Sequence, residues 1–341
     1  MSEKSTVRIA TYYEGFFYSS GVLACALLKL LPQYKDASIV RSRDKSVLDT
    51  CDIVVGVGGE YDPSRHRYDH NIKDFKESVS TIIRKPGYDW TVELTSAGLI
   101  YCYFGHEILR NVLSDVTEDG VIDEMFKFIY DKLIKEIDAI DIDEQMYGLV
   151  PLNLLGTNLS ARIYGLNFSL EFHEKEKQFE KAVALARKVF LEIVQDVKNV
   201  HLPSMDIVRH AVESRFEVDS SGEIITLSKS LPYEEYLFKL EMEMNMSPSI
   251  KYVIFEAIGS RNLFYWIECM PVALRSRMYR MLLPQAWGGL EGDALVEACG
   301  IEGALFVYPE RNSGGHKTKD GAITMAQEAL KIGKTVQGGE E

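Results

Sequence analysis

The chain has 341 residues, of which 46% are apolar, and it carries a formal net charge of −13. Such a length is enough for one large domain, or for the two that we expect. An acidic chain can bind RNA only through a local basic patch, so the total charge gives no support to nucleic-acid binding. The five cysteines stand singly without a CxxC pair, which indicates reduced core thiols and argues against a disulfide framework or a zinc site.

The N-terminal stretch MSEKSTVRIA has no apolar signal core, and no apolar run in the chain is long enough to span a bilayer. We therefore expect no membrane partner and a cytoplasmic or nuclear location. A mitochondrial location stays open, although it would require a targeting route other than a visible presequence.

Strand and helix patterns alternate in the N-terminal part of the chain. Residues 7–13, 37–41 and 53–57 have the composition of strands, and Gly21 to Leu31 has the apolar spacing of a helix. This alternation predicts an α/β fold with a doubly wound parallel sheet. Further helices are predicted from Thr95-Ser96 to Leu109, from Ile122 to the DAIDID stretch at 138–143, where the helix should end, and across residues 164–200.

After Pro203 the pattern changes to strands joined by turns. FEVDSSGEIITL predicts a strand pair with a hairpin turn at Asp219–Gly222. KYVIFEAI and LFYWIECMPV predict two more strands. A further strand is predicted at 303–308, followed by a glycine-rich GGHKT loop at 314–318 and a helix from Asp320 to Ile332.

This change of pattern places a domain boundary near residues 199–204. Residues 1–200 are expected to form the doubly wound α/β domain, which ends in a connecting helix. Residues 201–341 are expected to form a smaller α+β domain.

The stretch from Asp52 to Ile72 has the strongest functional signal. A short apolar strand is followed by Gly58-Gly59, and then by Tyr68-Asp69-His70-Asn71. Asp and His are ligands suited to Mg²⁺ or Mn²⁺, and residues at strand ends of an open α/β sheet lie where ligands bind. The alternative is a polar turn in which Asp69 and His70 are satisfied by local hydrogen bonds.

The same stretch carries a family resemblance. RYDHN, preceded by VGGEYDP, resembles the RYDHH motif of the exonuclease family named after the melanocyte-proliferating gene, a branch of the DHH phosphoesterase superfamily. The resemblance implies a DHH-like N-terminal domain and a metal-dependent exonuclease that acts on RNA from its 3′ end. Further blocks resemble the family in the same order between Ile9 and Leu330: ACALLKLLPQY, IVRSRD, SAGLIY, EIDAID, RFEVDSSG and GGHKTKDGA.

The departures from the family pattern lie at the metal ligands. YEGFFYSSG stands where the family has HNGxFHxDE, a glycine precedes VGG where the family has Asp, and DHN replaces DHH. The resemblance leaves Asp69, His70 and Asp141 as residual ligands, with Asp138 kept beside them. The former metal-site positions are Tyr13, Tyr18, Ser20, Gly56 and Asn71.

A two-metal centre holds ions about 3.5–4 Å apart and needs several anionic or imidazole ligands for each. A tyrosine phenol titrates near pH 10, so it does not replace them at neutral pH. We predict that the former and residual ligand positions meet in one pocket that holds no metal pair. No cofactor is expected, and the alternative is a single Mn²⁺ or Mg²⁺ at low affinity. Residues 13 and 16–18 either fill the emptied cavity as aromatic packing or form a stacking surface for a base.

The GGHKT stretch resembles the family's GGNKT block and the glycine-rich substrate loop of the superfamily's C-terminal domain. Glycines let backbone N–H groups face an anion, and the start of the following helix favours negative charge. The alternative is an ordinary Gly-Gly turn. The residues predicted to bind phosphate or RNA are Gly314, Gly315, His316 and Lys317.

Three functions remain open. The first is a catalytically inactive relative, a pseudoenzyme, that is kept for binding RNA or a nucleotide phosphate or for assembly. The second is a residual metal-dependent phosphodiesterase or RNA exonuclease that uses Asp69, His70 and Asp141. The third is a structural subunit of a larger protein complex. The sequence names neither the RNA nor the partner, and the oligomeric state stays open.

Overall fold

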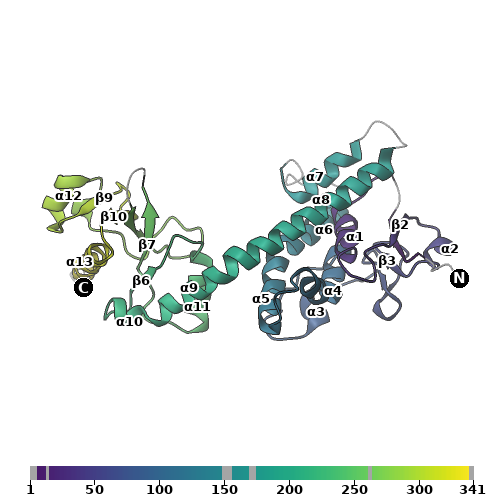
Figure 1. Cartoon of the computed structure of the whole chain (residues 1–341), viewed down its shortest axis with the longest axis horizontal. Helices are drawn as coiled ribbons and strands as arrows, with labels where there is room; N and C mark the ends of the chain where they lie inside the picture. Colours follow the sequence, from purple (N-terminus) through teal and green to yellow (C-terminus); the bar gives the residue numbers. More distant parts are fainter. Residues whose placement is uncertain (1–5, 13–14, 148–155, 169–173, 260–262, 338–341) are drawn as a thin grey trace. The chain divides into compact units, whose positions relative to one another are not determined.

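The computed structural model describes residues 6–12, 15–147, 156–168, 174–259 and 263–337. Contacts between residues divide the chain into two compact units, Met1–Lys198 and Asn199–Glu341 (Figure 1). Each unit has its own sheet and is described separately. None of the described helices is both long and apolar enough to cross a bilayer.

The N-terminal unit is built on a five-stranded sheet of order β2-β1-β3-β5-β4. The pairs β1–β2, β1–β3 and β3–β5 are parallel, and β4 is antiparallel to β5. Helices join β1 to β2 and β2 to β3, which confirms the predicted α/β class in this unit, but the sheet is mixed and not wholly parallel as predicted, because β4 runs antiparallel to β5. The strands are β1 (Arg8–Thr11), β2 (Ser38–Arg41), β3 (Ile53–Val55), β4 (Tyr61–Asp62) and β5 (Arg67–Tyr68).

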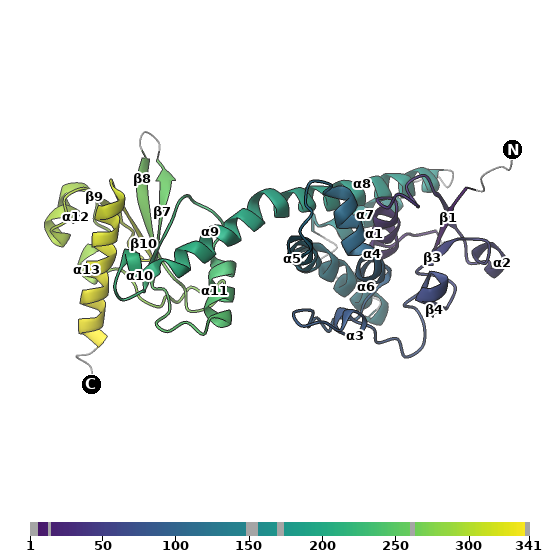
Figure 2. The ribbon, with the colours of Figure 1, turned by 60° about the horizontal axis from the view of Figure 1, so that its bottom comes forward.

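Helices pack on this sheet around α1 (Ser19–Leu28), which is buried along nearly its whole length because its residues are small or apolar on every side. It packs against α4 (Ser96–Val112) and α8 (Lys175–Asp196), as Figure 2 shows. The other helices are α2 (Lys45–Leu48), α3 (Val79–Ile83), α5 (Asp119–Ile129), α6 (Lys135–Tyr147) and α7 (Leu159–Gly165).

Two helix predictions in this unit are wrong in their boundaries. The DAIDID stretch lies inside α6, and a π-helical segment, Tyr130–Ile134, joins α5 to α6. The helix continues because residues 130–147 contain neither glycine nor proline. The single helix expected over residues 164–200 is divided, since α7 ends at Gly165 and α8 begins at Lys175.

The C-terminal unit has a second five-stranded sheet, of order β6-β7-β8-β10-β9. The pair β6–β7 is parallel, and the remaining neighbours are antiparallel. Its core lies between this sheet and the helices α12 and α13, where Ile267, Leu295 and Met325 are buried together. The elements are α9 (Leu202–Glu213), α10 (Arg215–Val218), β6 (Ile224–Leu227), α11 (Glu234–Glu243), β7 (Tyr252–Ile258), β8 (Leu263–Cys269), α12 (Gly292–Cys299), β9 (Ala304–Val307), β10 (Ser313–His316) and α13 (Lys319–Gln337).

Three predictions for this unit are wrong. Pro203 does not end the helical region, because it lies in the first turn of α9, where proline is tolerated. The FEV residues form α10, so the turn at Asp219–Gly222 joins a helix to β6 and is no hairpin. The expected glycine-rich loop is largely a strand, since Gly314, Gly315 and His316 belong to β10.

Candidate functional site

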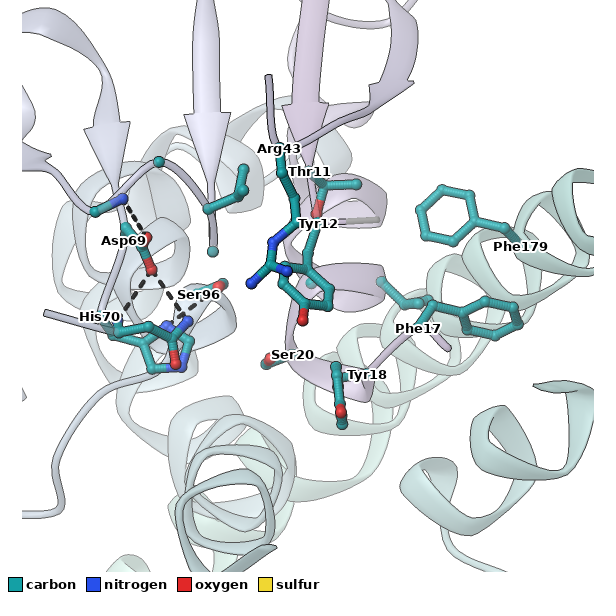
Figure 3. A pocket seen from close by; sticks show the side chains of 17 residues that line it. Thr11, Tyr12, Phe17, Tyr18, Ser20, Arg43, Asp69, His70, Ser96 and Phe179 are labelled. Atoms are coloured by element: carbon teal, nitrogen blue, oxygen red, sulfur yellow. Dashed lines mark hydrogen bonds between the residues drawn. The ribbon is translucent and has the colours of Figure 1, made fainter. Parts of the chain in front are cut away.

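A pocket of about 610 Å³ lies where β1 and β3 end, beside the first turns of α1 and α4 (Figure 3). Parallel neighbouring strands end at the same edge of a sheet, so the segments that follow them meet there. The residues that give the pocket its character are Thr11, Tyr12, Phe17, Tyr18, Ser20, Arg43, Gly56, Asp69, His70, Asn71, Ser96 and Phe179.

Most of the predicted site positions meet in this pocket although they are far apart in the sequence. Tyr13 lies outside the described residues. Asp141 is buried in α6 and does not line the pocket. The positions that the structure brings together are Tyr18, Ser20, Gly56, Asp69, His70 and Asn71.

Asp69 is buried, and protein donors occupy both oxygens of its carboxylate. Oδ2 accepts a hydrogen bond from the Gly59 N–H at 2.7 Å. Oδ1 accepts from the backbone N–H of Asn71 at 2.9 Å and from its side-chain amide at 3.0 Å. Asn71 stands where the family motif has its second histidine, and its amide here holds the Asp69 carboxylate in place. Asp69 therefore stabilises the turn through local hydrogen bonds, which agrees with the alternative that the DHN stretch is a polar turn.

His70 lies next to Asp69 at the inner end of the pocket. Its Nδ1 is 3.4 Å from Oγ of Ser96, the first residue of α4. Burial lowers the pKa of His70 below its usual value, although the Asp69 charge opposes this effect. The imidazole is therefore neutral at physiological pH.

Arg43 is a charged pocket residue that sequence reasoning missed. It follows β2, and Figure 3 shows its side chain reaching between Asp69 and His70 on one side and Tyr12 on the other. Its Cζ lies 5.0 Å from the centre of the Tyr12 ring, within the range of a cation–π contact. The IVRSRD block contained the signal, but only the parallel pairing of β2 with β1 places this arginine at the pocket.

The aromatic residues of the YEGFFYSSG stretch divide between packing and exposure. Phe17 is buried and meets the Phe179 ring edge-on, with centroids 5.5 Å apart. Tyr18 is 42% exposed, and its ring lies 6.1 Å from that of Tyr12. Phe16 is exposed and touches Phe168. Packing thus accounts for Phe17, whereas Tyr12 and Tyr18 present ring surface to the open pocket.

The donor set does not fit the two metals that the family resemblance implies. Among the lining residues that the structure describes, Asp69 is the one carboxylate and His70 the one imidazole, and Arg43 adds a positive charge beside them. The Asp69 oxygens already accept hydrogen bonds, as described above. Within the described ranges, no three His, Cys, Asp or Glu side chains are grouped so that they could hold an ion.

Asp138, which the resemblance kept beside Asp141, caps a helix. Its Oδ1 accepts hydrogen bonds from the N–H groups of Thr95 and Gly98, at 3.0 and 3.1 Å, and from the Thr95 hydroxyl. These donors belong to the start of α4, where Thr95 has no side-chain cap of its own. Asp138 therefore fixes the helix turn that carries Ser96 into the pocket.

The contribution of Asp138 to the stability of the N-terminal unit is expected to fall as the pH rises between about pH 4 and pH 7. Burial raises the pKa of Asp138 to about 7, and the charge of Asp141 adds to this effect. The folded state then holds a proton that the unfolded state has lost, so the slope should be about 1.4 kcal/mol per pH unit.

Urea unfolding of the wild type and of Asp138→Asn over this pH range measures the effect. The asparagine keeps an acceptor for the α4 donors but has no proton to lose, so its curve should be flatter. Equal pH dependence in the two proteins would show that Asp138 is ionised throughout.

The GGHKT stretch does not offer the free backbone donors that were expected of it. Gly314 and Gly315 pair with strands on both sides, β8 and β9. The Lys317 N–H donates to the Gly303 carbonyl at 3.1 Å, and the Thr318 N–H donates to Nδ1 of His316 at 3.0 Å. A Cβ at Gly315 would lie 2.6 Å from the Phe306 ring, so packing across the sheet explains this glycine. Phosphate binding by Lys317 stays a prediction.

Comparisons with known proteins agree on one family. The family model MYG1_exonuc, described as "Uncharacterised protein family (UPF0160)", matches residues 8–330. The human MYG1 exonuclease is 40% identical over 328 residues, which are 95% of this chain and 85% of that protein. The MYG1 protein YER156C of Saccharomyces cerevisiae is 28% identical over 342 residues, and the match covers 97% of each protein.

Two solved structures are similar at a low level. A pGpG-specific phosphodiesterase, PggH, from Vibrio cholerae is 13% identical with a TM-score of 0.25, and the match covers 96% of this chain and 98% of that one. The exonuclease RecJ bound to manganese is 9% identical with a TM-score of 0.25, and the match covers 95% of this chain and 89% of that one.

The fold and the site define a mixed α/β protein with a polar pocket at the ends of its parallel strands. The chain belongs to the MYG1 exonuclease family, because the family model spans nearly its whole length and the human member is 40% identical to it over 328 aligned residues. The family resemblance predicted from RYDHN and its neighbouring blocks is therefore confirmed.

Proposed function

We propose that this chain is a member of the MYG1 exonuclease family whose DHH-like N-terminal domain binds a nucleotide or the end of an RNA without two-metal hydrolysis. The observation that carries the proposal is the pocket's charge. One carboxylate with both oxygens hydrogen-bonded lies beside a guanidinium, where two metals would need several free anionic ligands.

The pocket has the groups that a nucleotide requires. The planar guanidinium of Arg43 can donate paired hydrogen bonds to a phosphate, and the hydroxyls of Thr11 and Ser20 add neutral donors. The rings of Tyr12 and Tyr18 offer surface on which a base can stack. A cavity of about 610 Å³ is within the usual size range of a small-ligand site.

The protein's own residues bind and orient the ligand in this proposal. Arg43 holds the phosphate, and the neutral His70 with Ser96 accepts or donates a hydrogen bond at the inner end. No hydrolytic step follows from these residues, because the described residues of the pocket do not supply the negative charge that two divalent ions need.

Calorimetric titration with AMP and with a short oligoribonucleotide, in the presence of EDTA, tests the proposal. Arg43→Gln is expected to weaken binding by about 10- to 100-fold, because it removes charged hydrogen bonds to phosphate. Arg209→Gln, which removes an equal charge from an exposed position on α9, is the matched control and should bind like the wild type.

Three other results would contradict the proposal. Loss of binding in Lys317→Ala, with Arg43→Gln unaffected, would place the ligand at the GGHKT stretch. Shortening of the RNA that requires Mn²⁺ and is lost in His70→Asn would establish a residual phosphodiesterase. Absence of binding in the wild type would favour a structural subunit of a protein complex.

A further inference from the structure

A second hollow, of about 1050 Å³, runs along the outer face of α8 next to strand β2. Its α8 wall includes Glu180, Ala184, Arg187 and Leu191, and Ile39 of β2 faces them. In the sheet as described, β2 is an edge strand, so one side of its backbone has no neighbouring strand. We refer to this surface as the α8 groove.

The four α8 residues form one stripe. They follow one another at spacings of four, three and four residues, which places them on the same face of the helix. Glu180 and Arg187 stand two turns apart on this stripe and are exposed. Neither has a charged partner among the residues that the structure describes, whereas the neighbouring Lys188 lies 3.8 Å from Glu192.

The order of Glu180 and Arg187 along α8 makes this face of the helix complementary in charge to the same face of a second, antiparallel copy. When two copies of α8 cross in antiparallel fashion, with the two-fold axis midway between residues 183 and 184, Glu180 of each copy comes opposite Arg187 of the other. If the two helices were shifted by one residue relative to each other, Glu180 would lie opposite Lys188, which carries the same charge as Arg187. The small side chain of Ala184 at the crossing allows the two helix axes to approach to about 8 Å.

We infer that the α8 groove binds a second copy of this chain, as an isologous dimer with two Glu180–Arg187 pairs about the two-fold axis. Burial of Ile39 and Leu191 supplies the apolar part of the interface. Exposed ion pairs attract only weakly, but like charges placed opposite each other cost more, so the pairs set the register. The inference is independent of the proposed function, because the groove contains none of the polar residues of the pocket.

Sedimentation of the full chain over a range of concentrations measures the dimer. Glu180→Arg and Arg187→Glu each place like charges face to face, and each is expected to weaken the dimer by about tenfold or more. The double variant Glu180→Arg/Arg187→Glu brings opposite charges together again and should restore the wild-type Kd. Glu297→Arg, the same change at an exposed position of α12, is the control and should leave it unchanged.

A second measurement uses Ala184→Cys. Its thiols would meet near the two-fold axis, so mild oxidation should give a cross-linked dimer, and adding Glu180→Arg should reduce its yield. The wild-type background is low because four of the five native cysteines are buried. Circular dichroism confirms that each variant is folded.

A wild-type chain that stays monomeric at micromolar concentrations in low salt would overturn the inference. A dimer that is insensitive to both single variants would do the same, because it would use another surface. Single variants that dissociate without rescue in the double variant would overturn the antiparallel arrangement.

Discussion

Alanine at Gly98 is expected to lower the free energy of unfolding of the N-terminal unit by about 3 kcal/mol or more. Gly98 lies in the first turn of α4, and an added Cβ would overlap Oδ2 of Asp138 and lie 2.7 Å from Cδ2 of Leu94. Asp138 cannot withdraw, because it is fully buried and bound to the start of α4. The substitution therefore breaks the contact between α4 and α6 that positions Ser96.

Urea unfolding followed by circular dichroism gives the measurement, with Gly120→Ala as the matched control. Gly120 also lies in the first turn of a helix, α5, and an added Cβ there meets nothing within 4 Å. The control should be neutral or stabilising by up to about 1 kcal/mol. Equal stabilities of the two variants would show that α4 and α6 can separate at little cost.

Aspartate at position 56, the ligand that the family resemblance implies there, is expected to destabilise the unit by about 2–4 kcal/mol and to create no tight Mn²⁺ site. Gly56 has a φ of +66°, a conformation that residues with a Cβ adopt only with strain. An added Cβ would also lie 2.5 Å from Oγ of Ser96. The backbone conformation at position 56 and the neighbouring Ser96 therefore both suit glycine.

A set of variants separates these causes. Gly56→Ala carries the strain and the close contact without the charge, and Gly56→Ala/Ser96→Ala removes the contact with Oγ while it keeps the strain. The double variant should recover part of the lost stability. If Gly56→Asp were as stable as the wild type and bound Mn²⁺ tightly, the pocket would be a metal site that lacks a single ligand.

The elements around the pocket follow from local sequence patterns. The apolar run at Ile53 to Val55 and the helical spacing after Thr95 predicted β3 and α4 correctly, because periodicity depends on which face of an element is buried. Predictions from the same patterns were wrong where a proline or a glycine was taken to end a helix or a strand. Pro203 suits the first turn of a helix, and Gly315 suits a strand because aromatic rings from the neighbouring strands leave no room for a side chain.

The sequence by itself identified the family, and it predicted which metal ligands of the family are replaced. Tyrosine, serine, glycine and asparagine at the former metal positions have no carboxylate or imidazole to offer in any fold. The predicted GGHKT loop shows the limit of such reasoning, since a motif does not reveal whether its backbone donors are already paired.

Only the tertiary structure decided what surrounds those positions. Arg43 reaches the pocket because β2, β1 and β3 run parallel and end at one edge of the sheet. Asp138 caps α4 because α6 packs against that helix. Asn71 donates a hydrogen bond to the Asp69 carboxylate because the chain turns there. The first two arrangements depend on contacts between segments far apart in the chain, for which no local pattern of residues exists.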